Sequence, residues 1–231
     1  LFENEEQSEE FAASMSGWKG GDSDAVLCIR SVEVLEDNSI LVVTELPTGD
    51  SLRDALSETG AFSAPEVQSI GVAILNGLSA VHDAGHIHGD IKPHAIHLTS
   101  AGPVLVDGGI TMGLWSAKHL GDKTALIGTP YYAPVEQFGG EAPDISSDIY
   151  NIATVLYELA TGVVPWPGKS FLEIFQAKLA PAPTPMSERA PGCEVPASLE
   201  EVIKGGLLTD RRERYTDAGV FRDLLAAADL S

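Results

Sequence analysis

The stretch HIHGDIKP, residues 86–93, and the stretch VLVDGG, residues 104–109, decide the fold of this chain. The first follows a predicted long helix and places an acid, Asp90, and a base, Lys92, in a short loop. The second places Asp107 at the end of an apolar strand. Two carboxylates delivered in this way can serve phosphoryl transfer, because one orients a hydroxyl group while the other holds a metal ion on phosphates.

The hydrophobic pattern before this loop predicts a small sheet followed by helices. Alternating apolar residues predict a β-hairpin that turns at Asp37-Asn38. Ser63 and Glu66 form a capping box, and apolar residues three and four apart then predict one long helix that stops at Gly85. The expected elements are a helix in residues 1–16, strands in 25–34 and 40–43, and helices in 51–60 and 63–85.

The pattern after the loop predicts a second hairpin and a mainly helical body. From residue 108 to residue 138 no period is sustained, so this range is expected to be a long loop, and such loops in compact domains are usually functional. The run from Ile149 to Ala160 is apolar on nearly every side, which is typical of a buried helix. The expected elements are strands in 96–98 and 104–106, and helices in 149–160, 170–179, 199–208 and 217–230.

The charge balance excludes some classes of partner. The 231 residues carry 34 acidic and 14 basic side chains, a formal net charge of -20, whereas nucleic acids and anionic membranes are bound by basic surfaces. The two cysteines lie far apart, so no disulfide framework is expected, and no apolar run approaches the ~20 residues of a membrane span. We therefore expect a cytoplasmic domain that binds no nucleic acid and does not itself insert into a membrane. It can equally be the intracellular domain of a membrane protein.

Several motifs, in the right order, resemble the bacterial Ser/Thr protein kinases. Residues 88–93, HGDIKP, resemble the catalytic loop H-R-D-L-K-P, and residues 107–109, DGG, resemble D-F-G. Residues 128–137 resemble the G-T-P and A-P-E end of the activation segment. Residues 147–162 resemble the central buried helix of the large lobe.

The resemblance implies an α+β, protein-kinase-like fold of two lobes with a truncated small lobe. Residues 1–46 are then the remnant of the small lobe, a helix plus a hairpin, and residues 47–231 are the mainly helical large lobe. The residues that line the adenine hinge would be Thr44, Glu45 and Leu46, with Thr44 as gatekeeper. The residues with implied structural roles are His88, Asp148, Glu136 and Arg214, of which the last two are expected to form an ion pair.

The resemblance also implies a phosphotransfer site that uses ATP and Mg²⁺. It makes Asp90 a general base, Lys92 a cation that steadies phosphate, and Asp107 a metal ligand that also contacts the nucleotide. Taken alone, the same residues also permit a plainer interpretation, in which one aspartate caps a polar loop and the other opens a Gly-Gly turn.

The departures from the family pattern matter as much as the matches. Neither G-x-G-x-x-G nor a V-A-I-K strand is present, so these residues lack the lysine that grips nucleotide phosphates in the family. Ala95 stands where the family has an asparagine that binds a second metal ion, and a methyl group cannot coordinate Mg²⁺. The other replaced positions are Gly89 for the arginine of H-R-D, Gly108 for the phenylalanine of D-F-G, and Val135 for the proline of A-P-E.

These departures favour a pseudokinase that acts as a regulatory or scaffolding module through protein–protein contacts. The main alternative is an active Ser/Thr kinase whose nucleotide loop and lysine lie outside these residues, with Glu9 or Glu10 as the ion-pairing glutamate of its small lobe. A small-molecule kinase ranks third, because such kinases use His-Gly-Asp but usually lack the G-T-P and A-P-E signals. A zinc site that begins at His86 and His88 is not expected, because Ile91 stands where the corresponding hydrolase motif has another histidine.

The long segment after Asp107 suggests a modification site. Gly89 supplies no guanidinium to grip a phosphothreonine, so phosphorylation is not expected to order the segment. The added charge would stay exposed, suited to a phosphothreonine-binding adaptor, after the action of an upstream kinase. Thr124 is the expected site because Lys118 and Lys123 lie near it, whereas Thr129 is expected to pack against the catalytic-type loop.

Overall fold

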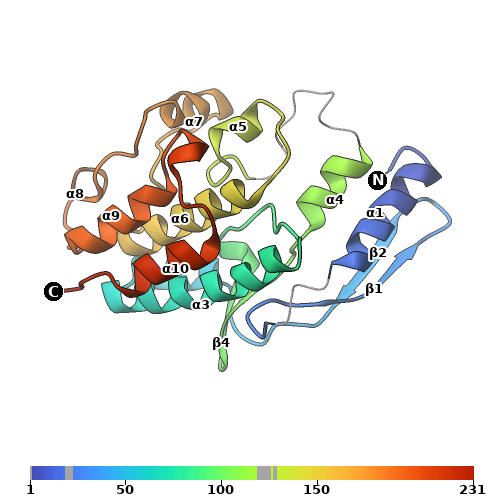
Figure 1. Ribbon diagram of the computed structural model, residues 1–231, viewed down its shortest axis with the longest axis horizontal. Helices are drawn as coiled ribbons and strands as arrows, with labels where there is room; N and C mark the ends of the chain where they lie inside the picture. Colours follow the sequence, from blue (N-terminus) through green and yellow to red (C-terminus); the bar gives the residue numbers. More distant parts are fainter. Residues whose placement is uncertain (1, 19–22, 119–125, 127–128) are drawn as a thin grey trace.

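A small lobe, made of one helix and one antiparallel hairpin, lies beside a larger and mainly helical lobe (Figure 1). The structure is a computed structural model, and it describes residues 2–18, 23–118, 126 and 129–231. Its elements are, in chain order, α1 (Glu5–Gly17), β1 (Ile29–Val34), β2 (Ile40–Thr44), α2 (Leu52–Thr59), α3 (Ala64–Asp83), η1 (Pro93–Ala95), β3 (Ile96–Thr99), β4 (Gly102–Leu105), α4 (Ile110–Ala117), α5 (Val135–Phe138), α6 (Ile145–Thr161), α7 (Phe171–Lys178), α8 (Met186–Arg189), α9 (Ala197–Gly206), η3 (Arg211–Glu213) and α10 (Ala218–Ala226).

Helix α1 has a capped start and one apolar face. The side chain of Asn4 accepts a hydrogen bond from the backbone N–H of Gln7, at 2.9 Å, and acidic residues occupy the first turn, where the helix dipole favours negative charge. Phe11 and Met15 are buried between α1, the first hairpin and Ala117 of α4. The predicted N-terminal helix is therefore confirmed.

The first hairpin pairs Val34 with Ile40 in antiparallel register. Asn38 makes the turn in the left-handed conformation, with φ +61, which asparagine tolerates better than most residues. One face of the hairpin packs against α1 through Val32 and Val42. A sheet of only two strands is marginally stable by itself, so this contact with α1 is needed to hold the hairpin.

Residues 25–27 do not belong to that hairpin, and the prediction that its first strand begins at residue 25 is wrong. The backbone N–H of Leu27 donates to the carbonyl oxygen of Leu105, and the N–H of Leu105 donates to the carbonyl oxygen of Ala25, both at 2.8 Å. These backbone groups are thus satisfied by β4 and not by β2. The short connection joins the small lobe to the second hairpin, β3–β4.

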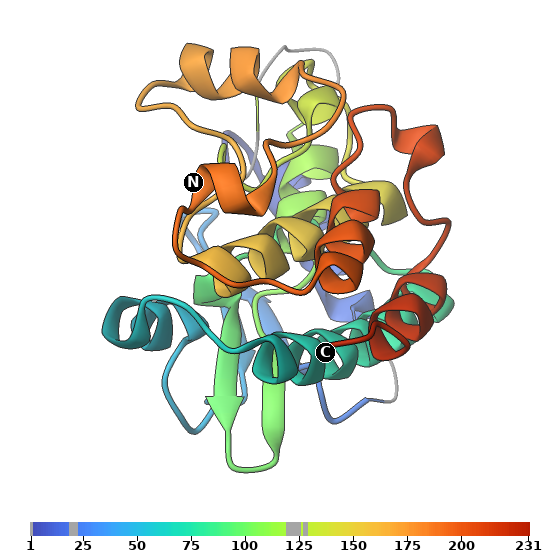
Figure 2. The same cartoon turned by 90° about the vertical axis from the view of Figure 1, so that its left-hand side faces the viewer.

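The core of the large lobe lies where α3, α6, α9 and α10 pack together (Figure 2). The predicted capping box begins α3, because the backbone N–H of Ser63 donates to the carboxylate of Glu66 at 2.8 Å. Helix α6 is buried from Ser147 to Thr161, in agreement with the run of residues that is apolar on nearly every side. It ends at Gly162, which takes the left-handed conformation common after a helix, with φ +75.

The segment after Asp107 is not one long loop, so the prediction of an uninterrupted loop over residues 108–138 is wrong. Helix α4 has eight residues and α5 has four. Leu114 and Ala117 of α4 pack into the cluster formed by α1 and the first hairpin. Helix α4 is therefore stabilised by a distant part of the chain, and a helix of this length is too short to show a sustained period.

The segment that carries α1 contributes to two hydrophobic clusters. Phe11, Met15 and Ala117 form a cluster of their own, whereas Trp18, which directly follows α1, belongs to the core of the large lobe. The division into residues 1–46 and 47–231 stays a prediction. Within the described residues, none of the helices combines the length and the apolar character that crossing a membrane requires.

Candidate functional site

Asp148, in the first turn of α6, organises the backbone of the loop at residues 88–93. Its carboxylate is fully buried and accepts hydrogen bonds from the backbone N–H groups of Gly89, at 2.8 Å, and His88, at 2.9 Å. The ring Nε2 of His82 lies 3.0 Å from the same carboxylate. These contacts satisfy polar groups of a loop that has no regular hydrogen-bonded structure of its own.

His88 supports the same loop from below. Its ring is buried, and Nε2 lies 2.9 Å from the carbonyl oxygen of Val106. Because a carbonyl oxygen can only accept, Nε2 carries a proton, and Nδ1 can accept a hydrogen bond from the backbone N–H of Asp90, at 3.4 Å. Burial lowers the pKa of His88, which favours this neutral ring.

Asp90 and Lys92 lie together, and the structure adds Thr129 to them. The Nζ of Lys92 forms an ion pair with Oδ2 of Asp90 and donates a hydrogen bond to the hydroxyl oxygen of Thr129, at 3.2 Å. Oδ1 of Asp90 accepts a hydrogen bond from the backbone N–H of Thr129, also at 3.2 Å. The three residues bring a carboxylate, an ammonium group and a hydroxyl into contact, and the expectation that Thr129 packs against the loop is met by these distances.

Gly89 cannot readily be replaced by a residue with a side chain. Its φ is +86, a left-handed conformation in which other residues are strained. A Cβ atom built on it would lie 3.3 Å from Cβ of Thr111 and 3.5 Å from Cβ of Pro143. Gly89 departs from the family pattern, but both its backbone conformation and its close neighbours favour a glycine at this position.

Asp107 and Ala95 occupy the positions where the family would bind metal ions. Asp107 is exposed and takes a left-handed conformation, with φ +61. Ala95 is 1% exposed, its carbonyl oxygen accepts a hydrogen bond from the backbone N–H of Val106 at 2.9 Å, and its methyl side chain cannot coordinate a metal ion. Among the described residues no group of three or more His, Cys, Asp or Glu side chains is placed to hold a metal ion. The residues present therefore do not fit a two-metal arrangement.

The expected adenine-hinge residues follow β2 and are all exposed. Thr44 ends that strand, Glu45 forms an ion pair with Arg30, and Leu46 is 89% exposed. An apolar side chain with that exposure packs against almost nothing in this structure. The predicted ion-pairing candidates of α1, Glu9 and Glu10, are likewise exposed.

The expected ion pair between Glu136 and Arg214 is present. The guanidinium donates to both carboxylate oxygens, at 2.7 Å and 3.1 Å, and its Nε donates to the carbonyl oxygen of Leu208 at 2.7 Å. The side chain of Arg214 is fully buried and that of Glu136 is 10% exposed. This pair ties α5, at the end of the activation-type segment, to the C-terminal part of the large lobe.

Two polar contacts near this segment, both at least partly buried, were not predicted from the sequence. Nζ of Lys178 donates to the carbonyl oxygen of Tyr131, at 2.9 Å, and burial lowers its pKa well below that of an ordinary lysine. Arg53 of α2 donates to Glu158 at 2.8 Å and to the hydroxyl of Tyr132 at 2.7 Å. Neither basic residue stands in a recognisable motif, and each meets partners that are far away in sequence, so no local signal marks them.

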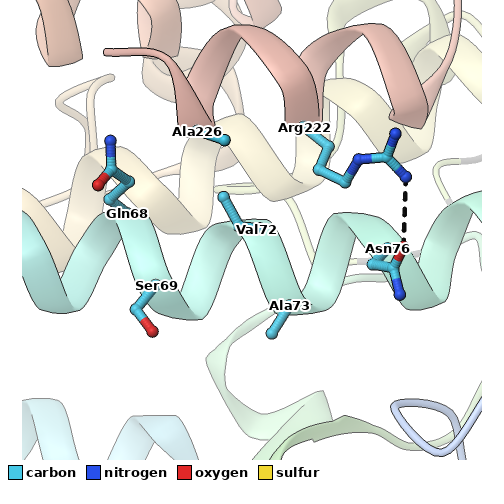
Figure 3. Close-up of a pocket in the computed structure, with 7 residues that line it drawn as sticks. All are labelled: Gln68, Ser69, Val72, Ala73, Asn76, Arg222 and Ala226. Carbon is cyan, nitrogen blue, oxygen red and sulfur yellow. Dashed lines mark hydrogen bonds between the residues drawn. The ribbon is translucent and has the colours of Figure 1, made fainter. Parts of the chain in front are cut away.

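A shallow groove of about 470 Å³ lies between α3 and α10, away from the residues described above (Figure 3). Arg222 of α10 donates a hydrogen bond to the side-chain oxygen of Asn76 across it, at 3.2 Å. Gln68 donates to the backbone carbonyl oxygens of Leu225 and Ala228 at 2.9 Å and 3.0 Å. These bonds fasten the last helix to α3 and give the groove a structural explanation.

The expected phosphorylation site, Thr124, lies outside the described residues. Of the other hydroxyl-bearing residues considered in the segment, Thr111 is 6% exposed and Ser116 is half-buried. Thr129 is held by Asp90 and Lys92, as described above. Modification of Thr124 therefore stays a prediction.

The two lobes, the ordered loop at residues 88–93 and the Glu136–Arg214 pair define the class as a protein-kinase-like domain. The chain matches the family model described as "Protein kinase domain" over residues 9–226. It therefore belongs to the protein kinase domain family.

Three similar proteins of known name come from bacteria. The chain is 34% identical over 183 residues to a probable serine/threonine-protein kinase PknB of Bifidobacterium longum, a match that covers 78% of this chain and 26% of that protein. It is 38% identical over 170 residues to a probable PknB of Corynebacterium glutamicum, covering 72% and 26%. It is 32% identical over 190 residues to the serine/threonine-protein kinase PknL of Mycobacterium tuberculosis, covering 81% and 47%. The matched region thus spans between about a quarter and a half of these relatives.

Proposed function

We propose that this domain is a pseudokinase, which regulates or scaffolds a protein partner and does not transfer phosphate. The observation that carries the proposal is Ala95, a buried methyl group at the position of the family's second metal ligand. Mg²⁺ requires oxygen ligands, and the one remaining ligand of the pair, Asp107, is exposed on a turn. A domain that holds Mg²⁺ and ATP weakly has to act through its surfaces.

An active Ser/Thr kinase is the second candidate, and the contact between Asp90, Lys92 and Thr129 favours it. A carboxylate beside an ammonium group can accept the proton of a substrate hydroxyl while the cation steadies a phosphate. In this structure both groups are bonded to each other and to Thr129, so a substrate would have to replace those bonds. The names of the relatives support this candidate at the level of the family alone.

A thermal-shift series with a repaired metal position separates the two candidates. Wild type and Ala95→Asn are each heated with ATP alone, with Mg²⁺ alone and with both. A ligand at about 100 times its Kd adds roughly 2.7 kcal/mol to the stability of the state that binds it. We expect no Mg²⁺-dependent shift for wild type, and Asp107→Ala serves as a control that removes the remaining ligand oxygen.

Transfer of labelled phosphate to a general protein substrate is measured on the same samples. The pseudokinase proposal predicts the same background for wild type and Asp90→Asn. A wild-type signal above that of Asp90→Asn, or a Mg²⁺-dependent wild-type shift near the size given above, would establish the active kinase instead. Ala95→Asn also tests whether the missing metal ligand is the cause of weak Mg²⁺ binding, since it adds the missing oxygen without changing Asp90.

We further propose that an upstream kinase modifies Thr124 and that a phosphothreonine-binding adaptor then docks there, in the cytoplasm. The net charge of -20 supports a protein partner in preference to nucleic acid or an anionic membrane. Incubation with a purified Ser/Thr kinase, followed by peptide mass spectrometry of wild type and Thr124→Ala, tests the first step. Unmodified Thr124, or a phosphorylated form that itself becomes an active kinase, contradicts the proposal.

A further inference from the structure

Trp18 lies directly against the two glycines that follow Asp107. A Cβ atom built on Gly108 would be 2.1 Å from Cζ2 of the indole, and one built on Gly109 would be 2.4 Å from Cδ1. Both separations are far below a van der Waals contact, so the ring occupies the space that side chains at these positions would take. Apart from that of Asp107, the turn at residues 107–109 has no side chain of its own. The indole of Trp18 fills the space that side chains at 108 and 109 would occupy.

The ring comes from the other lobe of the molecule. Trp18 follows α1 directly and is 4% exposed, and it belongs to the core of the large lobe. Phe11 and Met15, on the same helix, belong to the separate cluster of the small lobe. Trp18 is therefore the point at which the segment carrying α1 enters the large-lobe core.

The same helix also contacts the segment beyond the turn. A Cβ atom built on Gly113 of α4 would lie 3.0 Å from the ring of Phe11 and 3.3 Å from the sulfur of Met15. Helices α1 and α4 run side by side as a result (Figure 1). The Asp107 turn and α4 are thus both held by one continuous stretch of the small lobe, from Phe11 to Trp18.

Shape, and not a hydrogen bond, holds the indole. Its Nε1 is buried and has no hydrogen-bond partner among the residues that the structure describes. Buried tryptophans usually find a partner for this N–H. Because Trp18 has none in the described part of the chain, the packing of its ring against the turn holds it in place. The ring of His86, two residues before the loop at residues 88–93, has its centroid 6.1 Å from that of the indole.

We propose that Trp18 is a positioning residue for the Asp107 turn, supplying from the small lobe the side chain that the turn lacks, and that it couples α1 to α4. Movement of α1 away from the large lobe would withdraw the ring and release the turn. This role concerns the position of Asp107 and of α4 and is independent of whether the domain transfers phosphate. This role differs from ordinary core packing, because the ring packs directly against the backbone of one turn, at Gly108 and Gly109.

The direct test uses Gly108→Ala in a protein where Trp18 is the sole tryptophan, made by Trp115→Phe and Trp166→Phe. Gly108 does not need a left-handed backbone, so its alanine variant adds a methyl group without backbone strain. We expect Gly108→Ala to displace the indole, shifting its fluorescence to the red and increasing its quenching by acrylamide. In a Trp18→Ala background the same methyl group should leave the unfolding midpoint unchanged. An unshifted Trp18 emission, or equal destabilisation in both backgrounds, refutes the contact.

Hydrogen exchange tests the positioning role. In Trp18→Ala, the amides of residues 107–117 should exchange at least roughly tenfold faster, together with those of α1, while the amides of α6 keep their protection. Gly108→Phe added to Trp18→Ala provides a ring from the turn itself and should restore protection in 107–117. Unchanged exchange in 107–117, or equal loss of protection in α6, shows that Trp18 is only a packing residue of the core. If the double variant does not restore protection in 107–117, the proposal that the indole of Trp18 takes the place of a side chain at position 108 is wrong.

Discussion

Arg214 and Glu136, 78 residues apart in sequence, form a bidentate ion pair with Nη1–Oε1 and Nη2–Oε2 distances of 2.7 Å and 3.1 Å. The guanidinium also lies over the ring of Tyr150, 4.8 Å from its centroid, and bonds to the backbone oxygens of Leu208 and Thr209. Nη1 also donates to the hydroxyl oxygen of Ser146, at 3.0 Å, so all five N–H groups of the guanidinium are used within the protein. A group bonded in this way serves the fold and is not available to a ligand.

Removing one member of this pair should destabilise the domain strongly. Arg214→Ala leaves the carboxylate of Glu136 nearly buried without its counter-charge, which costs about 3–5 kcal/mol. The measurement is the urea midpoint of unfolding, with Arg212→Ala as control, because that side chain is 84% exposed. An unchanged midpoint for Arg214→Ala would show that the pair contributes nothing.

Replacing Asp148 should loosen the loop at residues 88–93. Asp148→Ala deprives the backbone N–H groups of His88 and Gly89 of their acceptors, and each unsatisfied buried donor costs about 1–3 kcal/mol. We expect a lower urea midpoint and faster hydrogen exchange in the loop. Glu201→Gln, an exposed acid on α9, is the matched control. Native exchange rates in the loop of Asp148→Ala would contradict this assignment.

The burial of His88 should make stability fall in mild acid. Burial lowers the pKa of His88 in the folded state, so below about pH 6.5 the unfolded chain binds a proton that the folded chain does not. Stability is then lost as pH falls, by up to about 1.4 kcal/mol per pH unit from this one group. Between pH 6.5 and 5, His88→Gln should show a flatter stability curve than wild type, whereas His94→Gln, at an exposed position, should not. Parallel curves for His88→Gln and wild type would disprove the neutral ring.

Lys178 should also make the folding stability increase with pH, in a higher pH range than His88. Burial, and then the nearby charge of Arg214, lower the pKa of Lys178 well below its ordinary value, so the unfolded chain binds one proton more than the folded chain. Stability should rise with pH, by up to about 1.4 kcal/mol per unit, until the ordinary lysine pKa is reached. Lys178→Met should remove that rise between pH 7 and pH 9 in equilibrium unfolding. Lys169→Met, on the surface before α7, is expected to keep it.

The kinase-type fold and the residues of the loop could be predicted because their signals are local. The capping box of Ser63 and Glu66 and the all-round apolar surface of α6 are properties of short stretches, and both features are present in the structure. The pairing of Glu136 with Arg214 is not local, and it came from the resemblance to a family. It could not have been obtained from periodicity or charge alone.

The features that were missed depend on contacts between distant segments. Helix α4 forms where its apolar residues meet Phe11 and Met15, and residues 25–27 bond to Leu105 instead of extending β1. Trp18 gave no signal, because an isolated tryptophan before a glycine-rich stretch is compatible with any loop. Gly108 departs from the family pattern, but the ring that takes up the space beside it lies about 90 residues earlier in the chain.

The bonds between residues 25–27 and Leu105 have a consequence for the order in which the chain acquires structure. On a ribosome the small lobe is made before the large lobe, yet its hairpin has only two strands and its helix contacts α4. Its lasting partners, Leu105 and the turn at residues 107–109, are synthesised some eighty residues after it, which at about 5–20 residues per second is a wait of several seconds. We therefore expect the small lobe, although it is translated before the large lobe, to become protected after it, so that a nascent chain that stops before residue 105 leaves the apolar residues of α1 accessible to chaperones.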